Sequence, residues 1–191
     1  MVLSPRFREA LVYAAELHAD QVRKGGRIPY FAHLMAVSAL VLEQGGAEDE
    51  AIAALLHDAV EDQGGIPTLH AIRARFGDGV AAIVDGCTDA VTNPKPTWRP
   101  RKEKYLRHLE EASPSVLLVS CADKVHNARS LVCDYRQHGD AIWARFNGGR
   151  DETLWYYREL TDVLGRRGPG PLSLELARVV GELHQLAGVS A

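Results

Sequence analysis

The chain has 191 residues, of which 46% are hydrophobic and 25% charged, a composition typical of one compact domain rather than of a disordered chain. Its formal net charge of -3 gives no overall attraction to nucleic acid or to an anionic membrane, so an anionic ligand needs a local basic cluster. No stretch reaches the ~18 apolar residues of a membrane span, and the N-terminal "MVLSPRFREA" lacks the apolar run of a signal peptide. We therefore expect a cytoplasmic protein that binds neither nucleic acid nor membranes.

The first half of the chain shows apolar residues at helical spacing, separated by glycines and one basic loop. Ser4 followed by Pro5 predicts an N-cap and the first residue of a helix. The basic loop "RKGGRIPY" follows that helix. The helices predicted in this half cover about 5–20, 32–44, 48–60, 68–76 and 79–88.

The second half begins with a proline-rich loop, "TNPKPTW", which we expect to be exposed. In the segment "SPSVLLVSCADKVHNARSLV", Ser113 can cap a helix that starts at Pro114 and enters the core. The other helices predicted here cover about 99–112, 151–164 and 174–186. Because no repeat and no strand-like alternation interrupts this pattern, the predicted fold is an all-α, single-domain helical bundle over 1–191.

The segment "AALLHDAVED" is an apolar helix that ends in His57, Asp58, Glu61 and Asp62. Residues four apart share a helix face, so all four side chains can line one cleft. Each of them alone is more often structural than functional. Together they are harder to explain as structure, because burying uncompensated carboxylates costs several kcal/mol each unless a cation or hydrogen bonds offset it.

Two other segments supply matching groups. Asp123 lies in the second polar segment, with Asn127 one turn and Ser130 a further turn along the helix, and His33 follows the basic loop. His33, His57, Asp58 and Asp123 would form a set of two imidazoles and two carboxylates, which suits a first-row divalent metal with positions left for water and a phosphoryl oxygen. The two carboxylates favour manganese over zinc.

These residues match the H...HD...D pattern of the HD superfamily of metal-dependent phosphohydrolases. Their surroundings resemble the hydrolase domain of the RelA/SpoT alarmone enzymes, in its stand-alone small alarmone hydrolase form. The resemblance covers about residues 7–135, a helical extension covers about 139–188, and it implies an HD-domain bundle. The segments that carry it are "HADQVRKGGRIPYFAH", "AALLHDAVED", "FGDGVAAIVDGCTD" and "CADKVHNARS".

The resemblance also implies roles for individual residues. It implies one Mn²⁺ ion held by the four ligands above, with Glu61 and Asp62 positioning or activating the attacking water. Arg23 and Lys24 match positions that contact the nucleotide, and Asn127 and Ser130 match positions near its sugar and base. The implied reaction removes the 3′-pyrophosphate of guanosine tetra- or pentaphosphate and gives GDP or GTP.

Two alternative functions stay open, and the chain departs from the family pattern at Gln63. The chain could be an HD phosphohydrolase for a 2′- or 3′-phosphomonoester of another nucleotide, or a non-catalytic nucleotide sensor, although the retained Glu61 and Asp62 favour an enzyme. A homo-oligomer is also open. Gln63 stands where the family commonly has Thr or Ser. The cationic run "RPRKEKYLRH" from Arg99 could face phosphates, and a solvated amphipathic helix explains it at least as well.

Overall fold

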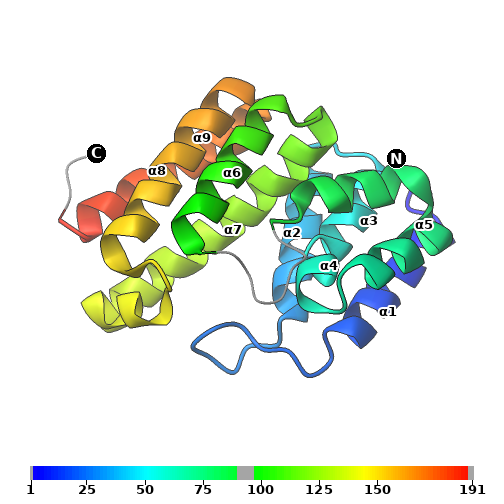
Figure 1. Cartoon of the computed structure of the whole chain (residues 1–191), viewed down its shortest axis with the longest axis horizontal. Coiled ribbons are helices and arrows are strands. Elements are labelled where there is room, and N and C mark those ends of the chain that lie inside the picture. Colours follow the sequence, from blue (N-terminus) through cyan, green and yellow to red (C-terminus); the bar gives the residue numbers. More distant parts are fainter. Residues whose placement is uncertain (1, 90–96, 189–191) are drawn as a thin grey trace.

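The protein is described by a computed structural model that covers residues 2–89 and 97–188. These residues form α-helices and one 3₁₀ helix with no β-strand among them, which confirms the predicted all-α class (Figure 1). Within the same residues, no helix combines the length and the apolar character that a membrane crossing requires. The elements are α1 (Pro5–Leu17), α2 (Phe31–Glu43), α3 (Glu48–Leu56), α4 (Ala59–Asp62), α5 (Ile66–Cys87), α6 (Trp98–Glu111), α7 (Pro114–His138), η1 (Gly139–Arg145), α8 (Gly149–Arg167) and α9 (Gly170–Leu186).

Local sequence signals explain where several helices begin. The Ser4 hydroxyl accepts a hydrogen bond from the Arg6 backbone N–H at 3.2 Å, and the Ser113 hydroxyl accepts one from Val116 N–H at 3.3 Å. Both predicted N-caps are therefore confirmed. The two helices predicted around Gly77 are one element, α5, which bends there because Gly77 adopts φ 89° and ψ 173°.

Three details differ from the sequence prediction. The helix predicted over 48–60 is interrupted, because α3 ends at Leu56 and residues 57–58 form a turn before α4. The loop "TNPKPTW" lies largely outside the described residues, but Trp98 opens α6 and is half-buried against Tyr156, at 5.9 Å between ring centroids, so the expectation of an exposed loop was wrong for this residue. The 3₁₀ helix η1 had no sequence signal.

The long helix α7 occupies the centre of the bundle (Figure 1). It packs against α2, α3 and α5 on one side and against η1, α8 and α9 on the other. The buried apolar side chains of the described residues form one contiguous cluster around it. A polar residue near the middle of α7 is therefore held by neighbours on both sides of the molecule.

The segment between α1 and α2 folds back on itself through a short antiparallel bridge between Val22 and Pro29. The Arg23 N–H donates to the Ile28 carbonyl at 2.8 Å, and the Tyr30 N–H donates to the Gln21 carbonyl at 2.8 Å. This bridge places the side chains of Gln21 and Tyr30 next to each other, at the point where the basic loop joins the bundle.

Candidate functional site

The structure brings the four predicted metal ligands together from three parts of the chain. His33 lies in the first turn of α2, His57 and Asp58 form the turn after α3, and Asp123 lies in α7. The ligand atoms of His33, His57 and Asp58 lie within 4.8 Å of one another. Asp123 Oδ1 is 3.2 Å from His33 Nε2 and 3.6 Å from His57 Nε2.

The chemistry of this cluster fits a divalent ion. His33 Nε2 and His57 Nε2 are buried and make no satisfactory hydrogen bond to any described residue. Each instead faces carboxylate oxygens, with His57 Nε2 at 2.9 Å and His33 Nε2 at 3.6 Å from Asp58 Oδ2. Separations near 3 Å are those of adjacent ligands around one small ion. Two buried imidazole nitrogens and two carboxylates would leave an ion with positions open.

The pKa values in the cluster show how strongly its charges interact. Burial alone would lower the pKa of His57, but Asp58 and Asp123 raise it well above its usual value. Burial would raise the pKa of Asp58, but His57 and His33 hold it well below its usual range. The carboxylates are therefore ionised at neutral pH, and a metal that binds His57 must displace the proton that these carboxylates stabilise.

The second ring nitrogen of each histidine fixes the ring's orientation. His57 Nδ1 lies 2.8 Å from the Ala54 carbonyl, to which it donates, so Nε2 is the nitrogen left for a metal. His33 Nδ1 lies 2.8 Å from Nδ1 of His126. Burial, followed by the charges of His33 and Arg23, lowers the pKa of His126 to about 4, so His126 is neutral and its Nδ1 can accept a hydrogen bond from His33 Nδ1–H. Sequence reasoning missed His126, whose only signal was its place three residues after Asp123.

Tyr30 holds the carboxylate of Asp58. Its hydroxyl donates to Asp58 Oδ2 at 2.6 Å, the same oxygen that faces the two histidines. Burial above all, then the charges of Asp58, Asp123 and Asp62, raises the pKa of Tyr30 above its ordinary value, so the hydroxyl stays protonated. Tyr30 thus fixes a ligand oxygen in place.

Replacing Tyr30 by phenylalanine is expected to weaken metal binding by ~10- to 100-fold, because it removes the donor that orients Asp58 without changing the shape of the ring. Titration of metal-free protein with Mn²⁺ measures the affinity directly. Tyr13→Phe, in α1, is the matched control, since the Tyr13 ring packs against Phe76 away from the cluster. Equal Mn²⁺ affinities for Tyr30→Phe and the wild type would show that Tyr30 does not orient the ligand.

The two predicted catalytic carboxylates occupy different places. Glu61 is half-buried and lines the cavity beside His57 and Asp58, with Arg101 Nη1 3.8 Å from its Oε1. Asp62 is exposed at the end of α4 and receives a hydrogen bond from the Gln21 side chain at 2.9 Å. Glu61 is therefore the carboxylate in the wall of the inner cavity, while Asp62 is exposed and is not among the residues that line it.

The predicted substrate-binding residues line a wider outer pocket of about 600 Å³, a volume suited to a nucleotide-sized ligand. Arg23 donates to the Asn127 side-chain oxygen at 2.9 Å, and Asn127 in turn donates to Asp123 Oδ1 at 2.5 Å. Lys24 lines the pocket from the exposed loop. Ser130 also lines it, although its hydroxyl donates to the His126 carbonyl at 3.0 Å.

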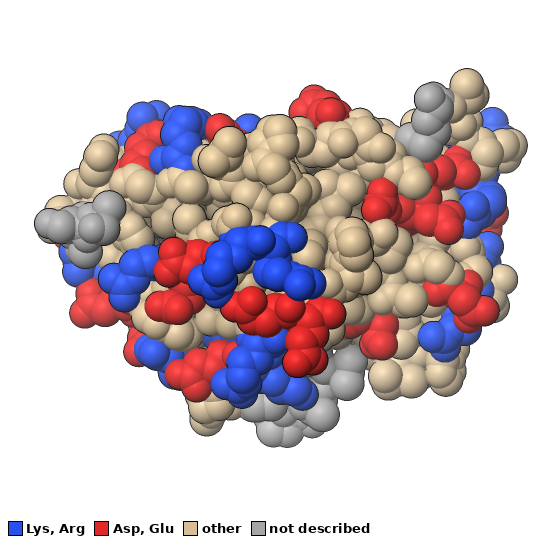
Figure 2. Space-filling view, turned by 90° about the horizontal axis from the view of Figure 1, so that it is seen from above, with Lys and Arg blue, Asp and Glu red and all other residues tan. Residues whose placement is uncertain are grey.

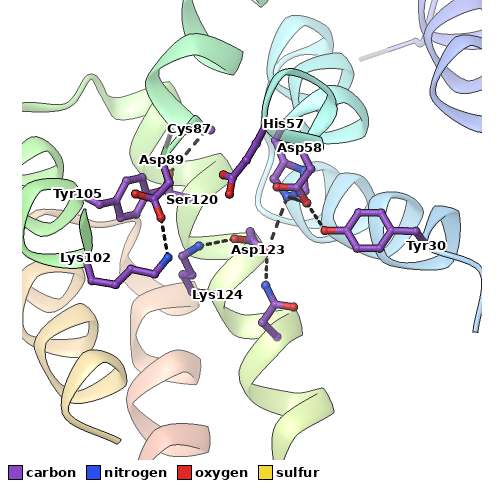
Figure 3. A pocket seen from close by; sticks show the side chains of 12 residues that line it. Tyr30, His57, Asp58, Cys87, Asp89, Lys102, Tyr105, Ser120, Asp123 and Lys124 are labelled. Carbon is purple, nitrogen blue, oxygen red and sulfur yellow. Dashed lines mark hydrogen bonds and ion pairs between the residues drawn. The ribbon is translucent and has the colours of Figure 1, made fainter. Parts of the chain in front are cut away.

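Two lysines that the sequence did not single out line the inner cavity of about 150 Å³. Lys124 is 2.6 Å from Asp123 Oδ2, and Lys102 is 2.6 Å from Asp89 Oδ2. Figure 3 shows Asp123 between these two lysines on one side and Asp58 with Tyr30 on the other. Burial, followed by the charge of Lys124, lowers the pKa of Lys102, and Asp89 opposes this shift.

Helix α6, which begins at Trp98, does not direct all of its cationic side chains to solvent. Arg101 and Lys102 point inward with side chains only 12% and 16% exposed, and both pair with Asp89. On the face seen in Figure 2, by contrast, Lys and Arg are interspersed with Asp and Glu, and the described residues show no extended patch of one sign there. Lys102 thus lines the inner cavity, and Arg101 and Lys102 line the outer pocket.

Comparison with known proteins places this site in a family. The family model for the HD domain matches residues 10–154. The chain is 40% identical over 126 residues to guanosine-3′,5′-bis(diphosphate) 3′-pyrophosphohydrolase MESH1 of Xenopus tropicalis, a match that covers 64% of this chain and 68% of that protein. It is 36% identical over 126 residues to the human MESH1, with the same two coverages.

The chain is also similar to part of a longer protein and to a solved structure. A probable guanosine-3′,5′-bis(diphosphate) 3′-pyrophosphohydrolase of Synechocystis is 37% identical over 125 residues, which cover 64% of this chain and 16% of that protein. The structure of a metazoan ortholog of SpoT, described as hydrolysing ppGpp and playing a role in starvation responses, superposes with a TM-score of 0.80 at 28% identity and covers 97% of this chain and 99% of that one. The chain belongs to the HD domain family.

Proposed function

We propose that the protein is a metal-dependent phosphohydrolase that removes the 3′-pyrophosphate of guanosine tetra- or pentaphosphate and releases GDP or GTP. The observation that carries this proposal is the pair of lysines, Lys102 and Lys124, in the inner cavity beside the ligand cluster. The names of the MESH1 and SpoT relatives support the same substrate. A nucleotide is thus the proposed small-molecule partner.

The ligand cluster would hold one divalent ion, for which Mn²⁺ is our proposal, through His33, His57, Asp58 and Asp123. Such an ion lowers the pKa of a bound water and neutralises charge on a phosphoryl oxygen. The carboxylates favour Mn²⁺ because hard oxygen donors suit it better than they suit zinc. The buried Nε2 atoms of the two histidines support an ion at this place.

Glu61 is the proposed general base. Its carboxylate lines the same cavity as Asp58 and Asp123, where a proton acceptor can reach a water held between the ligands and the substrate. The Arg101 guanidinium forms an ion pair with the Glu61 carboxylate, with Nη1 3.8 Å from Oε1. Asp62, the residue after Glu61, is proposed to orient the same water.

Cationic side chains in the two pockets would bind different parts of the substrate. Lys102 and Lys124 in the inner cavity would bind the departing pyrophosphate as point charges. Arg23 and Lys24 would bind the nucleotide in the outer pocket, together with Asn127, which accepts a hydrogen bond from Arg23. Ser130 would lie beside the sugar and base. The two pockets share Tyr30, Glu61, Lys102, Lys124 and Asn127 in their walls, so one ligand can occupy both.

The test is to incubate Mn²⁺-loaded protein with the 3′-pyrophosphate nucleotide and with a nucleoside 3′-phosphomonoester, and to measure pyrophosphate and orthophosphate separately. We expect pyrophosphate from the first substrate and little orthophosphate from the second, because Lys102 and Lys124 match the larger charge of a pyrophosphate. Rapid orthophosphate release from the monoester without attack on the alarmone would replace this proposal by the alternative HD phosphohydrolase. Binding of both without turnover would favour a nucleotide sensor.

We also propose that residues 1–191 form a single HD hydrolase domain that works in the cytoplasm without nucleic-acid or membrane partners. The one contiguous core of the described residues supports the single domain. The interspersed surface charges in Figure 2 support the absence of a nucleic-acid partner. Size-exclusion chromatography with light scattering would decide between a monomer and a homo-oligomer.

A further inference from the structure

Asp62 poses a physical problem for any catalytic role. It is exposed at the last position of α4, a helix of only four residues, and it follows Glu61, which lines the inner cavity. An exposed carboxylate samples several rotamers, and fixing it in one costs conformational entropy at the moment of reaction. A group that acts on a water molecule needs its orientation fixed beforehand.

Gln21 supplies that orientation from another part of the chain. Its side-chain Nε2 donates to Asp62 Oδ2 at 2.9 Å, although 41 residues separate the two. A carboxylate can only accept hydrogen bonds, so the amide group of Gln21 must turn its nitrogen, and not its oxygen, toward Asp62.

The oxygen of the same amide is held by two donors. Gln63 Nε2 donates to Gln21 Oε1 at 2.6 Å, and His18 Nδ1 lies 2.7 Å from the same oxygen. Because Oε1 can only accept, His18 must carry its proton on Nδ1. Its Nε2 is buried without a hydrogen-bond partner among the described residues.

The backbone around Gln21 and Gln63 is fixed as well. The Gln21 carbonyl accepts from Tyr30 N–H at 2.8 Å as part of the bridge before α2, and the His18 ring stacks on Tyr30 with centroids 5.4 Å apart. The Gln63 carbonyl accepts from the Thr68 hydroxyl at 2.7 Å. Hydrogen bonds thus hold both the backbone and the side-chain amide of Gln21. The segment that carries Gln21 and Tyr30 contacts Asp62 through Gln21 and Asp58 through Tyr30.

We propose that Gln21 is a positioning residue that fixes the carboxylate of Asp62 for catalysis, and that Gln63 and His18 hold the Gln21 amide in the orientation this requires. The inference rests on the proposed function, since it assumes that Asp62 acts on the reaction. Gln63 gains a specific task from it, because a Thr or Ser at that position is too short to reach Gln21 in the same way.

The experiment is a double-mutant cycle between Gln21 and Asp62 in the Mn²⁺-loaded protein. Gln21→Met keeps the length of the side chain and removes the amide, and kcat is expected to fall ~10- to 100-fold with KM and bound Mn²⁺ unchanged, as for the loss of a hydrogen bond to a charged group. In an Asp62→Asn background the same substitution is expected to change kcat less than twofold, because Gln21 has no catalytic carboxylate left to act through. Gln63→Thr is expected to lower kcat by ~2- to 10-fold, in the same direction.

Gln44→Met, at the exposed C-terminal end of α2, controls for the effect of exchanging a glutamine for methionine. Equal losses from Gln21→Met in the wild-type and Asp62→Asn backgrounds would mean that Gln21 acts only on the fold and would overturn the inference. A crystal structure of Gln21→Met gives a readout that does not depend on activity: a displaced or disordered Asp62 side chain supports the inference, and an unchanged one refutes it.

A negative result of the double-mutant cycle can be told apart from a failure of the proposed function. If the wild type cleaves a phosphomonoester and not the alarmone, the substrate assignment fails, and the same cycle is run on the monoester. If neither substrate is cleaved, the crystal structure alone decides whether Gln21 positions Asp62.

Discussion

Replacement of Asp123 by alanine is expected to eliminate both metal binding and turnover. Asp123 Oδ1 lies 3.2 Å and 3.6 Å from the Nε2 atoms of His33 and His57, so the substitution removes a carboxylate from the centre of the ligand cluster. Elemental analysis of the purified variant and an assay of pyrophosphate release measure the two losses. His57→Ala is expected to give the same pair of results, because it removes a ligand from the facing segment.

Asp123→Ala also leaves the buried ammonium of Lys124 without its partner at 2.6 Å, and breaking a buried ion pair costs ~3–5 kcal/mol of stability. Asp123→Asn is therefore the companion variant, since it keeps the shape of the side chain and a hydrogen-bond acceptor for Lys124. Asp162→Ala, on the exposed face of α8, is the control for an aspartate substitution on a neighbouring helix. Full activity in a folded Asp123→Ala protein that contains no metal would contradict the proposed chemistry.

Replacement of Glu61 by glutamine is expected to separate chemistry from binding. The amide keeps the size of the side chain but cannot take a proton, so kcat should fall by ~10²–10⁴ while the Mn²⁺ content and KM stay near those of the wild type. Asp62→Asn is expected to lower kcat in the same direction, because Asp62 is proposed to orient the water. Steady-state kinetics on metal-loaded protein, with metal content measured on the same sample, give all three quantities.

Glu111→Gln, at the exposed end of α6, is the matched control for the change from carboxylate to amide. Wild-type kcat in both Glu61→Gln and Asp62→Asn would show that neither carboxylate takes part in the reaction. Loss of metal from Glu61→Gln would instead make Glu61 a ligand, and the assignment of a general base would be wrong.

The sequence predicted those parts of the fold that depend on local signals. Ser4 and Ser113 cap helices as expected, since an N-cap needs only a side-chain oxygen one turn from the backbone N–H groups that it satisfies. The break after Leu56 was missed, because an unbroken apolar periodicity carries no sign of a turn at residues 57–58. Both residues of the turn keep φ and ψ in the right-handed helical region, so the break is slight.

Some residues of the site could be predicted from the sequence and others could not. The four candidate ligands could be chosen from residue type and spacing, and they converge in the structure. Lys102 could not, because an amphipathic pattern tells which residues share a helix face but not whether that face meets solvent or a cavity. His126 could not be predicted either, because a single histidine on a helix gives no sign of its partner in the fold. Only the structure shows that His126 Nδ1 lies 2.8 Å from His33 Nδ1.

The central position of α7 implies that different parts of the site open on different timescales. Asp123 sits in a helix packed against elements on both sides of the bundle, so exposing it requires loss of most of the fold, with a free energy close to that of global unfolding. The basic loop at 23–28 lies at the surface, where Ile28 is 59% exposed, and such segments open at little cost. Amide hydrogen exchange should therefore be slow around Asp123 and fast around Lys24. The loop that carries Lys24 would then open many times for each opening of the helix backbone around Asp123.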